Sequence, residues 1–466
     1  MAERVLLLNP CYKFIYRNAT IKEGAPYYPS LALASLAGKL TSGGHEVKIL
    51  DLNLFRNPDK ALTDAIREFR PGFAGITFST PLFYESDRIV KLIKKTAVDI
   101  IVIGGGSHCS ALPRETLAES SYDIICFGEG EETLSEIVSG KNYGSIDGIC
   151  YRGDDGALIM NGERDLLGDL DELPFPKWDL FEIEKYKVTE LLSRFSPTVG
   201  IETSRGCVFN CIYCNKSVFK RRFRKKSAQR VVNEMEYCLN MGFKEIHVLD
   251  DSFTIDMQRV EKIADEIINR GLKISWYSVS GIRVDLVNET LLRKLKRAGY
   301  YRAFFGIESG NQKILDRIKK GITIEQIKTA VQLARKAGME VYGAFMLALP
   351  DETEDSLKDT IKLALELDLD IAKTTITYPL VGTPLYRDYI SRGLIKSKDY
   401  SKYNFYTSPR ELYDHPTLDW DVIEKYYKLF YRKFYFRPGY LFKRLCSAIR
   451  KGSLLSDIGK ALRTKW

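Results

Sequence analysis

The chain has 466 residues and a formal net charge of +9 at pH 7, with 45% hydrophobic and 28% charged residues. This length suits about three domains that each bury a core, and no apolar run approaches the roughly 20 residues of a membrane-spanning helix. Three of the nine cysteines are clustered, whereas the other six lack paired spacing, which argues against a disulfide framework and favours a reducing cytoplasm.

Residues 1–151 alternate short apolar segments with amphipathic ones. Apolar strands that alternate with helices are typical of a doubly wound parallel sheet. The predicted fold class is therefore α/β, with a Rossmann-like N-terminal sheet. Helices are expected over residues 30–40 and 85–96, and the expected strands cover residues 4–10, 46–51, 75–79, 99–104 and 123–128.

In such sheets, ligands bind beyond the carboxyl ends of the strands. Those ends carry glycines and small polar residues in this chain, which allow the backbone to approach a bulky or anionic ligand. For His108, a hydrogen bond within its own turn is the alternative role. The candidate ligand-binding residues are Asn9, Ser79, Thr80, Gly104, Gly105, Gly106, His108, Gly128, Glu129 and Gly130.

Residues 152–197 are predicted to connect two domains. Residues 153–156 have the composition of a hairpin turn, and the two prolines of residues 173–176 cannot continue a helix. We expect the segment with Trp178 and Tyr186 to pack between the domains.

A second series of alternating strands and helices covers residues 198–386. Six β/α units predict a partial barrel, with functional groups at the strand ends. The expected helices cover residues 228–241, 257–269, 290–298, 324–337 and 354–367. The expected strands cover residues 198–203, 245–250, 274–280, 303–308, 341–349 and 374–379.

Cys207, Cys211 and Cys214 follow the first of these strands with the spacing CxxxCxxC. Thiolates are suitable ligands for iron–sulfur clusters. Three cysteines can hold three irons of a 4Fe–4S cluster and leave the fourth iron open to a small molecule. An incomplete zinc site and ordinary loop cysteines are the alternatives.

This motif, with Tyr213 just before its third cysteine, resembles that of the radical SAM superfamily, in which the open iron binds S-adenosylmethionine (SAM). Residues 249–254, 306–311 and 343–350 resemble the family's later strand ends in the same order, although Ala348 and Asp351 replace glycines of the commoner pattern. The resemblance implies SAM contacts at Tyr213, Asp250, Asp251, Arg283, Glu308, Ser309 and Phe345.

These residues also have structural alternatives. Asp250 and Asp251 could cap the next helix, Glu308 and Ser309 could order a turn, and Arg283 could belong to a salt bridge.

Residues 28–38 and the N-terminal strand ends resemble the cobalamin-binding domain that is fused to many radical SAM enzymes. The corrinoid fingerprint DxHxxG is absent, so no histidine of that motif is expected to bind cobalt. The resemblance implies that the candidate residues of the N-terminal sheet contact cobalamin.

Residues 387–466 are expected to be helical, and residues 421–466 hold twelve Lys or Arg against three Asp or Glu. Three interpretations suit the aromatic and basic pattern there. The segment could be a helix packed on the barrel, an interfacial helix at the inner membrane face or an RNA-binding segment. A second basic cluster of eight Lys or Arg, at residues 216–230, is expected to be a solvated loop.

Taken together, the resemblance implies an oxygen-sensitive cytoplasmic enzyme that methylates an unactivated carbon by means of methylcobalamin and a 5′-deoxyadenosyl radical. Reduced flavodoxin or ferredoxin is the expected electron donor, and a lipid, isoprenoid or tetrapyrrole is the expected substrate. Three alternatives are a radical ring-forming or oxidative enzyme, a tRNA methylthiotransferase and a non-catalytic corrinoid carrier. The methylthiotransferase would need three N-terminal cysteines, of which only Cys11 is suitably placed.

Overall fold

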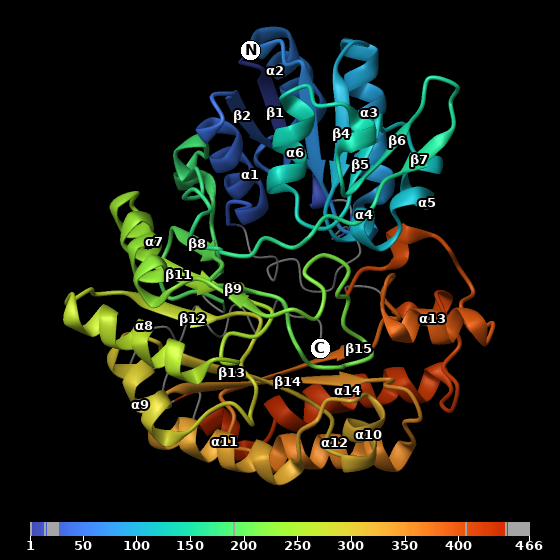
Figure 1. Cartoon of the computed structure of the whole chain (residues 1–466). Coiled ribbons are helices and arrows are strands. Elements are labelled where there is room, and N and C mark those ends of the chain that lie inside the picture. The colour runs from blue at the N-terminus through green and yellow to red at the C-terminus, as the bar shows by residue number, and fades with distance from the viewer. Residues whose placement is uncertain are drawn as a thin grey trace.

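The computed structural model describes residues 2–13, 15, 28–189, 192–405, 408–442 and 445. An N-terminal parallel sheet with flanking helices faces a second, curved α/β body, and the chain crosses between them in a long connector (Figure 1). This confirms the predicted α/β fold class.

The N-terminal sheet has the strand order β2-β1-β3-β4-β5-β6-β7. Its first five strands pair in parallel, as expected for a doubly wound sheet. An antiparallel hairpin of β6 and β7 extends one edge, around the turn predicted at residues 153–156. The strands are β1 (Arg4–Asn9), β2 (Glu46–Asp51), β3 (Phe73–Thr77), β4 (Ile101–Gly105), β5 (Ile124–Cys126), β6 (Ile149–Arg152) and β7 (Leu158–Met160).

Helices cover both faces of this sheet (Figure 1). The first begins where the Ser30 side chain accepts a hydrogen bond from the Leu33 N–H, at 3.4 Å. Its buried face, which includes Leu33, Ala34 and Ala37, packs toward the strands. The helices are α1 (Leu31–Ser42), α2 (Pro58–Phe69), α3 (Phe83–Thr96), α4 (Ser107–Ala111), α5 (Pro113–Ala118) and α6 (Glu131–Val138).

The connector packs against both bodies. Lys177 N donates to Ala34 O in α1, and Tyr186 Oη donates to Asp51 at the end of β2, both at 3.0 Å. On the other side, the Trp178 ring lies 6.0 Å from that of Phe243, which belongs to the second body.

Six parallel strands form the partial barrel, in two three-stranded sheets with the orders β12-β11-β8 and β13-β14-β15. Isolated parallel bridges at Trp276–Tyr300 and Ile282–Phe305 join the two sheets. The last strand begins three residues earlier than predicted, because Ile371 already pairs with Tyr342. The strands are β8 (Thr198–Ile201), β11 (Glu245–Val248), β12 (Ser275–Ser278), β13 (Arg302–Glu308), β14 (Glu340–Leu347) and β15 (Ile371–Ile376).

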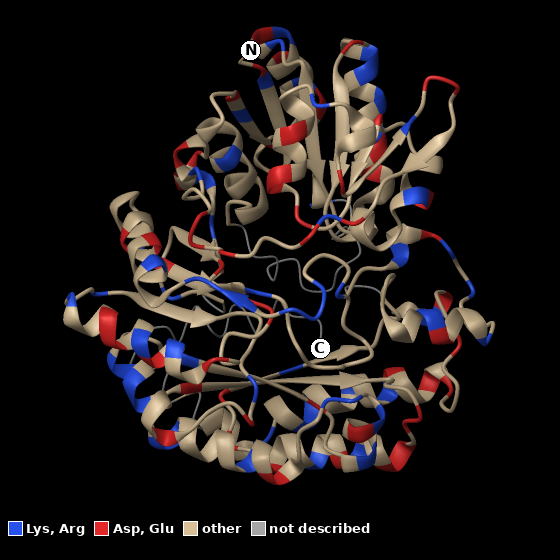
Figure 2. Ribbon diagram, in the orientation of Figure 1, with Lys and Arg blue, Asp and Glu red and all other residues tan. Residues whose placement is uncertain are grey.

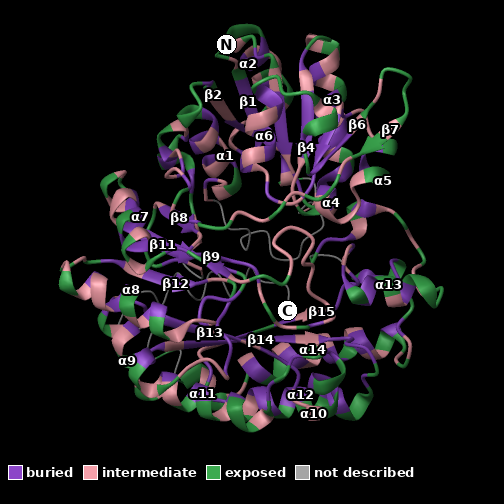
Figure 3. Cartoon of the chain, in the orientation of Figure 1, coloured by how far each residue is buried: buried purple, intermediate pink, exposed green. Residues whose placement is uncertain are grey.

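A short antiparallel pair, β9 (Ser204–Arg205) and β10 (Arg224–Lys225), lies beside the first barrel strand. The outer helices carry charges of both signs (Figure 2), while the strands between them are largely buried (Figure 3). This distribution is typical of amphipathic helices around a barrel. The helices are α7 (Ala228–Asn240), α8 (Met257–Asn269), α9 (Glu289–Arg297), α10 (Gln312–Arg317), α11 (Ile324–Lys336), α12 (Glu354–Glu366), α13 (Pro384–Ser391) and α14 (Trp420–Tyr435).

Helix α14 lies on the barrel with its aromatic face inward, as one of the three interpretations of the tail predicted. Phe430 and Phe434 are buried, and Tyr431 Oη donates to Thr374 O at 2.9 Å. The basic residues that the sequence analysis placed beyond Leu445 lie outside the described residues. Within the part of the chain that the structure describes, no helix has the length and apolarity to span a bilayer.

Candidate functional site

The cysteine loop begins directly after β9 and is held by backbone geometry. Gly206 has a φ of +83°, and a Cβ there would lie 2.3 Å from Arg222 O, so only glycine fits this position. Its N–H donates to Asp251 at 3.0 Å. Further along the loop, Ile212 N donates to Ile318 O at 3.2 Å, which ties the loop to the segment after α10.

The three cysteines of this loop are free thiols, with Cys211 buried and Cys207 and Cys214 half-buried. A hydrogen bond from Cys214 lowers the pKa of the Cys211 thiol to about 6, and Lys320 acts in the same direction. No three His, Cys, Asp or Glu side chains among the described residues are grouped as metal ligands. By donor chemistry the loop nevertheless fits an iron–sulfur cluster, since thiolates are the ligands of such clusters and the three thiols lie within eight residues.

Tyr213 and Glu308, both predicted to contact SAM, lie together beside the cysteines. Tyr213 Oη donates to Glu308 Oε1 at 3.1 Å. Lys320 Nζ lies 2.6 Å from the same carboxylate oxygen and 3.5 Å from Tyr213 Oη. A Cβ on Gly306 would meet these groups at 2.8 and 3.1 Å, so the glycine leaves room for the ion pair. The sequence analysis missed Lys320, because nothing near residue 320 forms a motif.

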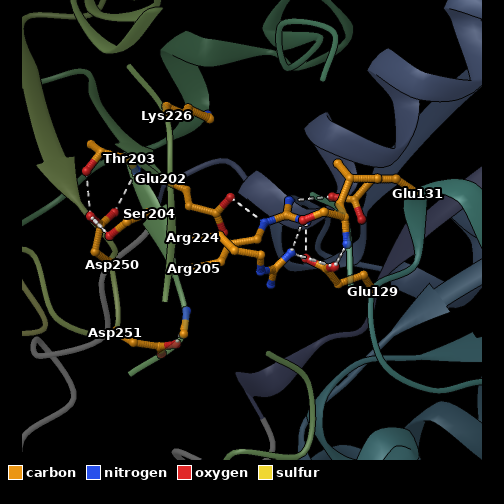
Figure 4. A network of polar contacts seen from close by, with 12 residues as sticks. Glu129, Glu131, Glu202, Thr203, Ser204, Arg205, Arg224, Lys226, Asp250 and Asp251 are labelled. Atoms are coloured by element: carbon orange, nitrogen blue, oxygen red, sulfur yellow. Dashed lines mark hydrogen bonds and ion pairs between the residues drawn. The ribbon is translucent and has the colours of Figure 1, made fainter. Parts of the chain in front are cut away.

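Asp250 and Asp251 have different surroundings at the end of β11. Asp250 is buried and accepts hydrogen bonds from Thr203 N (2.6 Å), Thr203 Oγ1 (2.5 Å) and Ser204 Oγ (2.6 Å), so its carboxylate holds the start of the cysteine loop (Figure 4). Asp251 is exposed to solvent and accepts the hydrogen bond from the Gly206 N–H. Neither residue caps the next helix, because Asp256 is the N-cap of α8.

Arg283 belongs to a salt bridge, as the alternative interpretation proposed. Its guanidinium makes two bonds to Asp285, at 2.9 and 3.0 Å, and lies 3.5 Å from the centre of the Phe209 ring in the cysteine loop. Arg283 thus packs against the cysteine loop through Phe209. A direct contact of Arg283 with SAM stays a prediction.

Ser309 and Phe345 are buried away from the barrel interior. Ser309 Oγ lies 3.2 Å from Thr360 Oγ1 in α12 and accepts from Asn311 N at 3.2 Å, which orders the turn after β13. The Phe345 ring packs against Phe430 of α14, with ring centres 5.2 Å apart. Because side chains alternate along a strand, Ala344 and Met346 are the β14 residues on the opposite face, and the contact of Phe345 with SAM stays a prediction.

Lys373 is a charged residue on that opposite face that the sequence analysis missed. Gly306, Ala344 and Lys373 are paired in register across β13, β14 and β15. Gly306 lies beside the Glu308–Lys320 ion pair, and no carboxylate of the described residues forms an ion pair with Lys373. Desolvation lowers the pKa of Lys373. A single cation here can hold an anionic group of a bound molecule. The predicted strand began at Thr374, one residue later, so Lys373 carried no signal as a barrel residue.

A cavity of about 390 Å³ opens at the carboxyl ends of the N-terminal strands. It lies between α1 and the strand ends, and residues of the second body close it. Six of the predicted ligand-binding residues line it: Gly104, Gly105, Gly106, Gly128, Glu129 and Gly130. A Cβ on Gly105 or Gly128 would meet nothing within 4 Å, so a side chain there would occupy the cavity. Because these glycines leave the space free, the cavity can accept part of a corrinoid.

The other predicted residues of this sheet do not line the cavity. His108 is buried on α4, where Nδ1 lies 3.2 Å from Thr80 Oγ1 and the ring packs 4.7 Å from that of Tyr400. Burial lowers the pKa of His108 to about 4. Ser79 is exposed and Asn9 is half-buried at the end of β1. Contacts of these four residues with cobalamin stay predictions.

Arg224 and Lys226 correct the expectation of a solvated loop at residues 216–230. Both are buried, because Arg224 pairs with Glu129 and Lys226 with Glu234, at 2.8 and 2.7 Å. Glu129 therefore forms ion pairs with Arg205 and Arg224 (Figure 4) and also lines the cavity.

Comparisons with known proteins agree with this arrangement. A family model described as the radical SAM superfamily matches residues 201–364, and one described as a B12 binding domain matches residues 18–138. The chain is 35% identical over 422 residues to the uncharacterized methyltransferase PH0819 of Pyrococcus horikoshii, with 89% of each chain covered. It is 29% identical to the anaerobic magnesium-protoporphyrin IX monomethyl ester cyclase of Rubrivivax gelatinosus, covering 87% of this chain and 73% of the relative.

The fold is also that of a solved structure. The radical SAM methyltransferase TsrM of Kitasatospora setae, solved with cobalamin and a 4Fe–4S cluster, superposes with a TM-score of 0.69 at 20% identity, over 84% of this chain and 78% of TsrM. A radical SAM domain uses a 4Fe–4S cluster and SAM, and a B12 binding domain uses cobalamin, so these three are the cofactors of this enzyme. The chain belongs to the radical SAM superfamily, within the group whose members carry an N-terminal B12 binding domain.

Proposed function

We propose that this enzyme transfers a methyl group from SAM to an unactivated carbon of a small-molecule substrate, with cobalamin as the methyl carrier. One observation carries the proposal. Glu202 and Arg205, which precede the cysteine loop, line the same cavity as the glycines at the N-terminal strand ends. A corrinoid held at those strand ends would therefore lie next to the loop that holds the cluster.

When bound, the cluster and SAM supply a carbon-centred radical, and cobalamin supplies a methyl group that a substrate radical can accept. The residues of the chain would hold and orient these groups. Cys207, Cys211 and Cys214 would bind three irons, while Asp251, Tyr213 and Glu308 would hold SAM beside them. Gly104, Gly105, Gly106, Gly128 and Gly130 would admit the corrinoid, and the buried ion pairs around Arg205 would exclude water between the two sites.

The test is a product analysis under anaerobic conditions with SAM, hydroxocobalamin and titanium citrate, which replaces the reduced flavodoxin or ferredoxin that we propose as natural donor. Methyl donation converts SAM to S-adenosylhomocysteine, whereas reductive cleavage gives methionine and 5′-deoxyadenosine. We expect both nucleoside products from the intact enzyme. Cys211→Ala should abolish 5′-deoxyadenosine and keep the corrinoid.

Two of the three alternatives give other product patterns, and the third, a methylthiotransferase, differs in holding a second cluster and therefore about eight irons. A ring-forming or oxidative radical enzyme would form 5′-deoxyadenosine without S-adenosylhomocysteine, and a corrinoid carrier would form neither product. Either pattern would contradict the proposed methyl transfer.

We further propose a lipid, isoprenoid or tetrapyrrole substrate and contact with an anionic membrane surface. The tetrapyrrole is supported by the name of the R. gelatinosus relative. The membrane contact is supported by exposed apolar side chains after α14, of which Leu441 and Phe442 are 50% and 70% exposed. Binding of the L441S/F442S variant to phosphatidylglycerol vesicles should fall several-fold. Ile390→Ser on α13, where the isoleucine is 47% exposed, is the matched control, and unchanged binding of the double variant would refute the contact.

A further inference from the structure

Buried ion pairs join the two bodies of the molecule (Figure 4), and several of the paired residues line the cavity. Arg205 Nη1 lies 2.7 Å from Glu129 Oε1, and its Nη2 lies 2.5 Å from Glu131 Oε1. Its Nε lies 2.7 Å from Glu202 Oε1. Each donor nitrogen of the Arg205 side chain thus has a carboxylate partner, and two of those partners belong to the N-terminal body.

The same carboxylate of Glu129 also receives Arg224 Nη1, at 2.8 Å from both oxygens, and Leu167 N of the connector, at 2.8 Å. Side chains of the ion-paired residues are at most 14% exposed. Burial opposes charge on Glu131, but Arg205 outweighs it and holds the pKa of that carboxyl below its ordinary value. The charges are therefore paired in a low-dielectric setting, where removing one partner leaves another uncompensated.

Arg205 is also joined to the cysteine loop through the backbone. Only Gly206 separates it from Cys207, and its strand β9 pairs with β10 at Arg205–Arg224. Gly206 in turn is fixed by Asp251, one of the residues proposed to hold SAM. A shift of the Arg205 backbone in β9, following a change in its ion pairs, would move the start of the loop relative to Asp251.

On its other side, this group of ion pairs meets the cavity. Glu129, Glu131, Glu202 and Arg205 all line it, together with Gly105 and the apolar side chains of α1. A molecule in the cavity would therefore lie against the carboxylates that orient Arg205. One side chain thus has the cavity on one side and the cluster loop on the other.

We propose that Arg205, held by Glu129 and Glu131, is a positioning residue that couples corrinoid occupancy of the cavity to the affinity of the cluster loop for SAM. This inference rests on the proposed function. Because coupling between two binding sites is reciprocal, cobalamin should raise SAM affinity by the same factor as SAM raises cobalamin affinity. We expect a factor of about ten, within the usual range for coupled sites.

The experiment measures the Kd of SAM on the cluster-reconstituted full chain, with and without saturating hydroxocobalamin. The wild-type Kd should fall about tenfold when hydroxocobalamin is added. In Glu131→Gln the factor should approach one, while the iron content and the far-ultraviolet circular dichroism stay as in the wild type. Glu132→Gln is the matched control, since Glu132 is on the same helical turn but pairs with Lys39 and does not line the cavity; it should keep the wild-type factor.

Arg205→Lys is a second variant, because it keeps the charge and loses the two-pronged geometry. It should also lose the coupling. A wild-type factor near one, or wild-type coupling in both Glu131→Gln and Arg205→Lys, would overturn the inference. Failure of the proposed function is seen separately, as a wild-type enzyme that binds no hydroxocobalamin or forms no S-adenosylhomocysteine.

Discussion

Three non-glycine residues within a few positions of the ends of β13 and β14 adopt a left-handed backbone. Glu308, Ala348 and Asp351 have φ values of 66°, 59° and 66°. Two of these are the positions where the family resemblance led us to note missing glycines. L-residues pay about 1–2 kcal/mol for this conformation, and at Asp351 an ion pair with Arg317 offsets part of the cost.

This strain predicts a stability difference between two variants of Asp351. Asp351→Gly should be about 1 kcal/mol more stable to urea than Asp351→Ala, because both lose the ion pair and only glycine relieves the backbone. At Asp355, in the first turn of α12, the order should reverse, since glycine costs about 1 kcal/mol relative to alanine in a helix. Equal stability of the two Asp351 variants would refute the strain.

His108 predicts a pH dependence of stability. Burial lowers its pKa to about 4 from an ordinary value of 6.5, so the unfolded chain binds a proton first as the pH falls. Stability should therefore be lost progressively between these two values, by about 2 kcal/mol at about pH 5. His108→Gln should remove this part of the loss in urea titrations. Identical pH profiles for the two proteins would show that His108 is not buried as a neutral ring.

At the scale of elements, the ends of β4 and β5 and the start of α1 create the cavity. Gly105 ends β4 where an added Cβ has free space. Gly105→Leu should therefore fold normally and lower bound corrinoid at least about tenfold, because its side chain fills the binding volume. Gly168→Leu is the control, since Gly168 is exposed in the connector and also has free space around it.

Absorbance of the bound corrinoid, with iron analysis and circular dichroism, measures both variants. Normal corrinoid content in Gly105→Leu would place the corrinoid elsewhere. The same loss in Gly168→Leu would show that the effect is not specific to the cavity.

Most elements could be predicted from the sequence, because each has its own periodicity and its own start signals. The five parallel strands before residue 130 and the six barrel strands were predicted with shifts of a few residues at their ends. Strands β6 and β7 were missed because each is short and half-exposed, so neither has a buried apolar run. The five cavity glycines Gly104, Gly105, Gly106, Gly128 and Gly130 were found from their place at the strand ends, which is a local signal.

At the scale of the whole molecule, the sequence could not predict which charges meet. Glu129 and Arg205 are 76 residues apart, and neither lies in a pattern that indicates its partner. Arg224 was predicted to lie in a solvated basic loop, because the local sequence holds no acidic residue and its partner Glu129 comes from the other body. Lys320 and Lys373 were missed for the same reason, because their roles follow from barrel closure and strand register.

The arrangement of the two bodies leads to the central claim, that one chain binds a 4Fe–4S cluster and a corrinoid at facing sites. The most direct test is to purify the protein anaerobically with hydroxocobalamin, reconstitute it, and determine iron, sulfide and corrinoid per chain. Near four irons, four sulfides and one corrinoid are predicted, because the chain offers one cysteine loop and one glycine-lined cavity in its described part. Four irons without corrinoid, or about eight irons as in a methylthiotransferase, would contradict the account.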